Sequence, residues 1–329
     1  MRVKGVCLQS RTRREALTEG VIAGVFFGTA AVFVRFAQDL NLFSIVFWRL
    51  VIACAALVMV LIVFKKSFQF SLVRKNLREL LGLSVFLSLH FILFTFSVKD
   101  TTILNATVLV STTPVFSMLV SSFVFKVKPS RLALIGLTIS FIGVCLIAYG
   151  ETVTSKTFGE GVSPTLKGDL EATAAAFVEA FYLNYGKKIR SQMNILSTML
   201  PIYAFAAIVV GVLSVPARNM ISGFPFAAQS SLALVGLGLL PTAIAHTLYF
   251  SSLSNLKSFE TATMAFLEPI GATILGIAAF QEVPAPIFAF GAAIVLTGIF
   301  FVFRNTDLRR PRLKNTRRKN GLQSSDQLE

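Results

Sequence analysis

Long apolar runs alternate with short polar segments along almost the whole chain. Ten runs of about twenty residues can be placed, at 20–38, 44–64, 79–98, 102–125, 131–149, 169–187, 197–215, 230–252, 260–280 and 284–303. An apolar helix of about twenty residues crosses the hydrocarbon core of a bilayer. The pattern therefore predicts an all-α membrane protein with ten transmembrane helices.

The Gly and Pro pattern near the end of the chain occurs twice. A shift of 155 residues superposes Pro114 on Pro269, Pro129 on Pro284, Gly136 on Gly291 and Gly143 on Gly298. Gly and Pro are scarce, with 21 and 11 residues among 329, so four matches at one offset indicate an internal repeat. The ten helices then form two halves of five. Because five is odd, the second half must insert the other way up, and inverted repeats are a common plan of secondary transporters.

Composition and charge agree with this picture. The chain is 54% hydrophobic and 14% charged, against about 25% charged in soluble domains. The net charge of +15 suggests a nucleic-acid partner, but most of the 31 Lys and Arg fall on alternate loops. Cytoplasmic loops carry such an excess. We therefore predict a multi-pass inner (plasma) membrane protein with both termini in the cytoplasm, and no nucleic-acid partner.

The predicted organisation has five parts. They are a basic cytoplasmic tail at 1–19, a first five-helix repeat at 20–149, an external linker at 150–168, a second repeat at 169–303 and a basic cytoplasmic tail at 304–329.

No motif in the sequence indicates a metal or a cofactor. Cys7, Cys54 and Cys145 are scattered and lack metal-ligand spacing. No GxxxxGK[ST] phosphate loop occurs, so energy for transport would come from a gradient or from exchange.

Several longer motifs carry a family resemblance. They are FWRL at 47–50, NATVLVSTTPVFSMLVSSFVF at 105–125, GDLEATAAAFVEAFYLNYGKK at 168–188, and the segment 241–282 with its LEP element. Over roughly residues 18–303 the chain resembles the drug/metabolite transporter superfamily, specifically its EamA-type ten-helix members. The resemblance implies two EamA repeats around a central substrate cavity, lined by helices one, three, four, six, eight and nine.

The chain departs from that resemblance at two places. The fourth helix of similar proteins usually ends in a Glu, as the ninth does here at Glu282, but this chain has Lys126 and Val127. The sixth helix usually carries a Trp where this chain has Glu179, and the corresponding aromatic of the first helix is Phe27. A carboxylate in place of an aromatic ring would change what the cavity prefers.

Two carboxylates, Glu179 and Glu268, lie deep inside predicted spans. Glu179 lies near the bilayer midplane, where a charged group costs at least a few kcal/mol unless it is paired, protonated or hydrated, and Tyr182 shares its helix face. Glu268 precedes Pro269, which frees backbone carbonyls that can line a cavity. Each Glu is a candidate ligand for a cationic group or a proton carrier. The structural alternative is a hydrogen bond to a neighbouring helix.

Other polar and aromatic residues complete the candidate set. His90 and His246 are the only histidines, and each could bind substrate, relay protons or simply hydrogen-bond between helices. Further candidates are Tyr249, which shares a face with His246, Phe27 and Phe94, which could stack on a substrate ring, and Asn105 on the fourth helix. For Arg49 the resemblance favours a structural role.

The sequence as a whole predicts a secondary transporter for a small organic metabolite, working by alternating access with proton or exchange coupling. Carboxylates among aromatics favour an amino-acid-like or cationic substrate, and S-adenosylmethionine is one candidate. Within transport, the alternative is an exporter of drugs or amino acids. Another class, a membrane-embedded lipid-modifying enzyme, would need Asp-rich or His/Asp clusters at a membrane face, and the sequence has none. The oligomeric state stays open.

Overall fold

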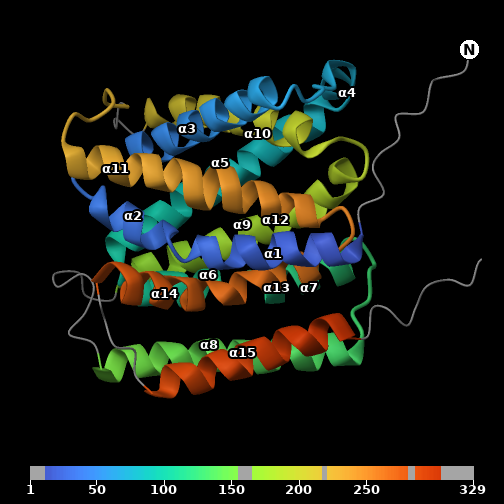
Figure 1. The fold of residues 1–329 in the computed structure, drawn as a ribbon, viewed down its shortest axis with the longest axis vertical. Coiled ribbons are helices and arrows are strands. Elements are labelled where there is room, and N and C mark those ends of the chain that lie inside the picture. Colours follow the sequence, from blue (N-terminus) through green and yellow to red (C-terminus); the bar gives the residue numbers. More distant parts are fainter. Residues whose placement is uncertain (1–11, 155–164, 217–220, 281–285, 305–329) are drawn as a thin grey trace, which may run out of the picture.

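The computed structural model describes residues 12–154, 165–216, 221–280 and 286–304. Within these ranges all regular structure is helical, and the helices run roughly side by side (Figure 1). In chain order they are α1 (Arg13–Phe27), α2 (Ala30–Phe36), α3 (Leu42–Val63), α4 (Phe70–Lys75), α5 (Leu77–Asp100), α6 (Ile103–Val110), α7 (Thr113–Phe123), α8 (Arg131–Thr154), α9 (Leu166–Arg190), α10 (Ile195–Ser214), α11 (Ala228–Leu237), η1 (Gly238–His246), α12 (Thr247–Ser252), α13 (Ser258–Thr263), η2 (Met264–Leu267), α14 (Glu268–Phe280) and α15 (Pro286–Arg304).

These elements confirm the predicted fold class. Within the described ranges, eight helical runs are long and apolar enough to cross a membrane. The other two of the ten predicted spans are α9, which carries more charge, and the α13–η2–α14 run, which is divided into three short elements. Glu282 and Pro284, in the turn before the last helix, lie outside the described residues.

The first helix begins earlier than the apolar pattern indicates. It starts at Arg13, inside the segment predicted as tail, because Thr12 and Glu15 form a capping box. In this arrangement the Thr12 side chain accepts from the Glu15 amide, and the Glu15 carboxylate accepts from the Thr12 amide. Two of the backbone donors at the helix start are thereby satisfied.

Contacts at the two ends of the bundle establish that the halves are inverted. At one end, which we call the tail side, Arg13 of α1 pairs with Glu260 of α13 at 3.5 Å, and Lys187 near the end of α9 donates to the Leu256 carbonyl. At the other end, the linker side, Thr101 accepts from Arg35 at the end of α2 through its carbonyl oxygen. The Thr101 hydroxyl donates to Asp169 at the start of α9, so α1–α2 and α9 run in opposite directions.

Helices of the two halves correspond at the offset found in the sequence. The starts of α8 and α15 are 155 residues apart, as are the starts of α6 and α13. The helices α8 and α15 also pack along each other at one edge of the bundle (Figure 1). The repeat in the sequence is therefore an inverted repeat in space.

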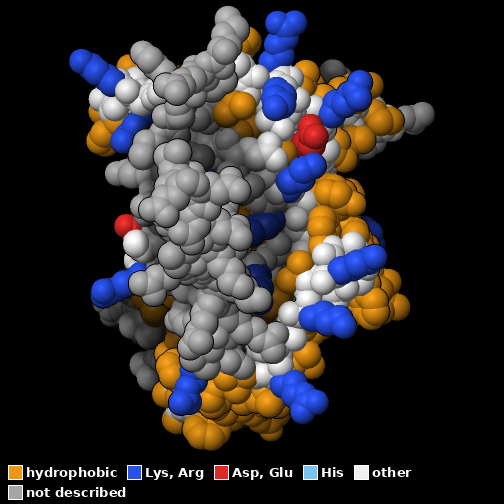
Figure 2. Space-filling model, turned by 90° about the vertical axis from the view of Figure 1, so that its right-hand side faces the viewer, with side chains coloured by type: hydrophobic (Ala, Val, Ile, Leu, Met, Phe, Trp, Pro, Cys, Tyr) orange, Lys and Arg blue, Asp and Glu red, His pale blue; other side chains and the backbone are white. Residues whose placement is uncertain are grey.

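Lys and Arg gather at the tail side. Figure 2 views this end, where basic side chains surround the visible face and acidic ones are few. The basic residues at this end include Lys65, Lys66, Arg74, Lys75, Arg78, Lys126, Lys128, Arg131, Lys187, Lys188 and Lys257. The structure thus brings to one end the charges that led us to predict a cytoplasmic location for both termini.

Small residues allow helix backbones to touch, and α8 and α15 are one such pair. A Cβ on Gly136 would lie 2.5 Å from the Gly298 carbonyl oxygen and 2.7 Å from the Val302 amide nitrogen. A Cβ on Gly143 would lie 2.7 Å from the Val295 amide nitrogen. Such close approach through small residues is typical of membrane helix pairs.

We predict that Gly136→Ala lowers stability by about 1–3 kcal/mol because it overpacks the α8–α15 contact. Gly82→Ala is the matched control, since a Cβ there meets nothing within 4 Å. The measurement is thermal unfolding of both variants in detergent. Equal midpoints for Gly136→Ala and the unmodified protein would contradict the close packing.

Candidate functional site

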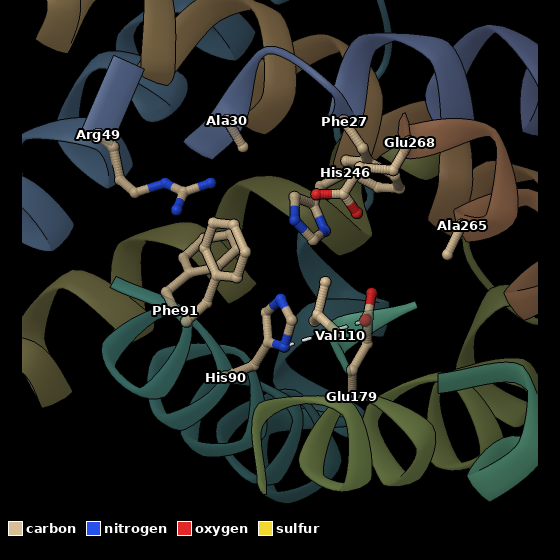
Figure 3. A pocket seen from close by; sticks show the side chains of 11 residues that line it. Phe27, Ala30, Arg49, His90, Phe91, Val110, Glu179, His246, Ala265 and Glu268 are labelled. Atoms are coloured by element: carbon tan, nitrogen blue, oxygen red, sulfur yellow. Dashed lines mark ion pairs between the residues drawn. The ribbon is translucent and has the colours of Figure 1, made fainter. Parts of the chain in front are cut away.

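A small cavity lined by buried residues lies where the two halves meet (Figure 3). Its volume is about 30 Å³, room for roughly one or two water molecules. The residues that line it are Phe27, Ala30, Arg49, His90, Phe91, Phe94, Val110, Glu179, His246, Ala265 and Glu268. An organic molecule can occupy this site only if helices or side chains move apart.

Glu179 of α9 forms one acidic part of the wall. Its Oε2 accepts a 3.0 Å hydrogen bond from the hydroxyl of Thr113, the first residue of α7. The Nδ1 of His90 lies 3.9 Å from the same oxygen and 3.0 Å from the Ala175 carbonyl oxygen. Because a carbonyl oxygen only accepts, His90 carries its hydrogen on Nδ1 when it bonds there. Glu179 therefore combines the predicted interhelical hydrogen bond with a place in the cavity.

Glu268 supplies a second carboxylate. It is the first residue of α14 and is 5% exposed, and its side chain has no hydrogen bond or ion pair to another described residue. In Figure 3 its side chain extends toward Phe27 and His246. A buried carboxylate without a partner is unfavourable, so this position suits a bound cationic group or a proton.

Helix breaks place these side chains at the cavity. The α1–α2 run breaks at Gly28, where a Cβ would lie 2.5 Å from the Glu268 carbonyl oxygen, so α1 and α14 approach closely. The segment η1 is a π-helix that contains Pro241 and ends at His246. Proline removes a helix hydrogen bond, and π-helical turns occur frequently at functional sites.

Aromatic rings form the apolar wall. The ring of His246 lies edge-on to Phe27 at 4.7 Å and to Phe91 at 4.8 Å, and it is 5.9 Å from His90. The Nδ1 of His246 is buried and unpartnered among the described residues. The two histidines, which come from different halves of the chain, thus meet across the cavity.

Arg49 of α3 supplies the cationic part of the wall. It is 1% exposed, and its guanidinium carbon lies 3.7 Å from the centre of the Phe91 ring. Its Nε donates to the Thr242 hydroxyl in η1 at 3.0 Å, while its Nη1 is buried with no hydrogen-bond partner in the described part of the chain. Arg49 lies across the cavity from Glu179 and Glu268 (Figure 3).

Six of the nine residues named from the sequence line this cavity, and three lie elsewhere. Tyr182 is buried against Phe250, with its hydroxyl 3.7 Å from the sulfur of Met199. Tyr249 packs behind Phe27, with ring centres 5.0 Å apart. Asn105 lies at the linker side, where its amide donates to Asp169.

Sequence reasoning gave too little weight to two lining residues and left one contact unassigned. Arg49 could have been predicted as a site residue from the sequence, because an ionisable residue inside an apolar span is a functional candidate by default. Phe91 could not be distinguished from the other 31 phenylalanines. The hydrogen bond from Thr113 to Glu179 depends on packing between α7 and α9 and leaves no mark in the sequence.

In the described residues, eight helices long and apolar enough to cross a membrane lie with two further helical segments in two inverted halves around a partly polar cavity, which is the architecture of a multi-pass membrane transporter. The chain belongs to the EamA-like transporter family, whose model matches residues 16–149 and 166–304.

Relatives of this chain have transporter names without an assigned substrate. An uncharacterized transporter of Archaeoglobus fulgidus is 29% identical over 294 residues, which cover 87% of this chain and 94% of the relative. The uncharacterized transporter YxxF of Bacillus subtilis is 24% identical over 273 residues, which cover 82% and 83%. A solved crystal structure shares the fold with a TM-score of 0.73 and 16% identity, over 89% of this chain and 98% of its own.

We predict that Thr242→Val lowers stability by about 1–3 kcal/mol, because the Nε of Arg49 loses its acceptor inside the protein. Thr138→Val is the control, since that hydroxyl is exposed and bonds only within its own helix. Thermal unfolding in detergent measures both variants, and Thr242→Ser should restore most of the loss. A Thr242→Val midpoint equal to that of the control would contradict the assigned contact.

Proposed function

We propose that this transporter moves a small organic metabolite, amino-acid-like or cationic, across the inner membrane by alternating access through the cavity. The observation that carries the proposal is the pair of buried carboxylates, Glu179 and Glu268, in an otherwise largely aromatic and aliphatic cavity. Carboxylates hold ammonium or other cationic groups, and the rings of Phe27 and Phe94 offer apolar contact for the rest of the molecule.

The contacts at the two ends of the bundle support alternating access. At the linker side Asn105 at the start of α6 bonds Asp169 at the start of α9. At the tail side Glu260 at the start of α13 pairs with Arg13 at the start of α1. Asn105 and Glu260 are equivalent under the 155-residue offset, so each end is closed by corresponding helices of opposite halves. Opening one contact at a time would expose the cavity to one side of the membrane.

In this proposal, Glu179 and His90 couple transport to the movement of protons. Their side chains are 3.9 Å apart, so a proton on either changes the charge that a substrate meets. Exchange of one metabolite for another is the alternative source of energy. S-adenosylmethionine stays a candidate substrate, since its sulfonium suits the carboxylates and its adenine suits the rings.

The direction of transport follows the gradients, because alternating access is reversible. An exporter of drugs or amino acids would use the same cavity and the same residues. Membership of a transporter family favours either direction of transport over a membrane-embedded lipid-modifying enzyme. The excess of Lys and Arg at the tail side supports cytoplasmic termini.

We predict that Glu179→Gln lowers exchange of labelled amino acids or S-adenosylmethionine in proteoliposomes by about tenfold or more, because a charge-assisted hydrogen bond becomes a neutral one. Glu171→Gln is the matched control, with the same chemical change on the same helix but outside the cavity. Rates are measured at several pH values. Unchanged rates and an unchanged pH dependence for Glu179→Gln would refute binding or coupling by this carboxylate.

A further inference from the structure

We infer that the substrate carries an anionic group as well as a cationic one, and that Arg49 binds the anionic group. The ligand class is a zwitterion of the α-amino acid type, with its carboxylate at Arg49 and its ammonium at Glu179 and Glu268. This inference rests on the proposed transport function and narrows its substrate class.

Arg49 is a buried cation without a counter-ion among the described residues. A guanidinium keeps its charge in proteins, and this one is 1% exposed with no carboxylate within ion-pair distance among the described residues. A buried charge without a counter-ion is strongly unfavourable. Contact with the Phe91 ring and the Thr242 hydroxyl holds the group in place. Its Nη1 is buried and has no hydrogen-bond partner among the described residues.

The partly buried cation Lys187 is a contrasting case with a structural role. Lys187 donates to the carbonyl oxygens of Leu253, Ser254 and Leu256, and so caps the end of the α12 segment. It does not line the cavity. Arg49 has no carbonyl partner of this kind among the described residues, and it lines the cavity.

Positive and negative side chains lie on opposite sides of the cavity. Arg49 lies on one side and Glu179 and Glu268 lie on the other, with the ring of His246 between them (Figure 3). No ion pair joins Arg49 to either carboxylate in the described structure. A zwitterion places its carboxylate opposite Arg49 and its ammonium opposite the two Glu side chains, so each side gains a counter-charge. A simple amine would leave Arg49 without a partner, and a simple acid would leave the two carboxylates without one.

A second cavity lies about one helical turn from the first, toward the linker side. Its volume is about 200 Å³, and Val34, Arg35, Gln38, Val98 and Lys99 line it. Val34 of α2 and Val98 of α5 follow the cavity residues Ala30 and Phe94 by four positions, which is about one turn of the same helices.

This outer cavity is basic. The Nε of Arg35 is buried without a hydrogen-bond partner among the described residues, and the Nζ of Lys99 donates to the carbonyl oxygens of Gln38 and Leu40. Cations at a mouth raise the local concentration of anions. Arg35 and Lys99 would attract a substrate carboxylate here. Asp39 and Asp100 near Lys99 offset part of their charge.

The test compares molecules that differ only in the carboxylate. The pairs are L-leucine with isopentylamine, L-methionine with 3-(methylthio)propylamine, and L-phenylalanine with phenethylamine. Binding to the purified full-length protein is measured by calorimetry, and exchange is measured in proteoliposomes. In at least one pair, the wild type should bind the amino acid at least about tenfold more tightly than its amine, since charge-assisted hydrogen bonds are at stake.

Variants assign that preference to Arg49. Arg49→Gln should abolish the preference for the amino acid, and Arg49→Lys should keep part of it because the charge remains without the two-pronged geometry. Arg78→Gln, at an exposed arginine of the tail side, should leave the preference unchanged. Thermal unfolding of each variant shows whether it is folded; if Arg49→Gln is not, the comparison rests on Arg49→Lys.

Three results would overturn the inference, and they differ in what they leave standing. Wild-type protein that binds and exchanges the amines as well as the amino acids refutes the anionic group but leaves the transport proposal intact. A folded Arg49→Gln that retains the preference refutes Arg49 as the binding residue. Failure of the wild type to bind or exchange any member of the panel refutes the zwitterion and the amino-acid-like substrate of the proposed function together.

Discussion

The burial of ionisable groups at the middle of a bilayer-spanning bundle is the constraint on which this structure depends. Such groups lose hydration and must find partners within the protein, a proton or a ligand. Glu179 accepts a hydrogen bond from Thr113 and lies near His90. Arg49 and Glu268 are only partly satisfied by the described residues. Both of these groups line the cavity, as the proposed binding role requires.

Irregular helices build that cavity. The break between α1 and α2, the π-helix η1 and the 3₁₀ segment η2 each contribute or adjoin lining residues. Irregular backbone at membrane depth is tolerated where it is buried in protein or lines a cavity. Gly28 and Gly271 let α1 and α14 touch, which holds Phe27 beside Glu268. Regular helices such as α8 and α15 pack through glycines at the edge of the bundle, away from the site.

Because the two halves are inverted copies, corresponding pairs of helices make the polar contacts at both ends of the bundle. The polar contacts at the linker side and at the tail side join helices that correspond under the 155-residue offset. Their chemistry differs, since Asn105 bonds Asp169 at one end and Arg13 pairs with Glu260 at the other. The cavity between them is similarly asymmetric, because Arg49 comes from the first half while both carboxylates come from the second. The repeat therefore determines the arrangement of the helices, and residues that differ between the halves determine where the charges lie in the cavity.

The sequence by itself determined the ten helices, their inverted halves and the basic end of the bundle, because hydrophobic length, Gly and Pro spacing and loop charge are local or periodic signals. It also indicated Glu179, Glu268, His90 and His246, since polar groups within apolar spans are conspicuous. Only the tertiary structure decided which polar groups meet. In the structure, Asn105 lies at the linker side, and Arg49 lies in the cavity wall opposite the carboxylates. Those outcomes depend on the rotation and crossing of helices far apart in the chain, which no local pattern encodes.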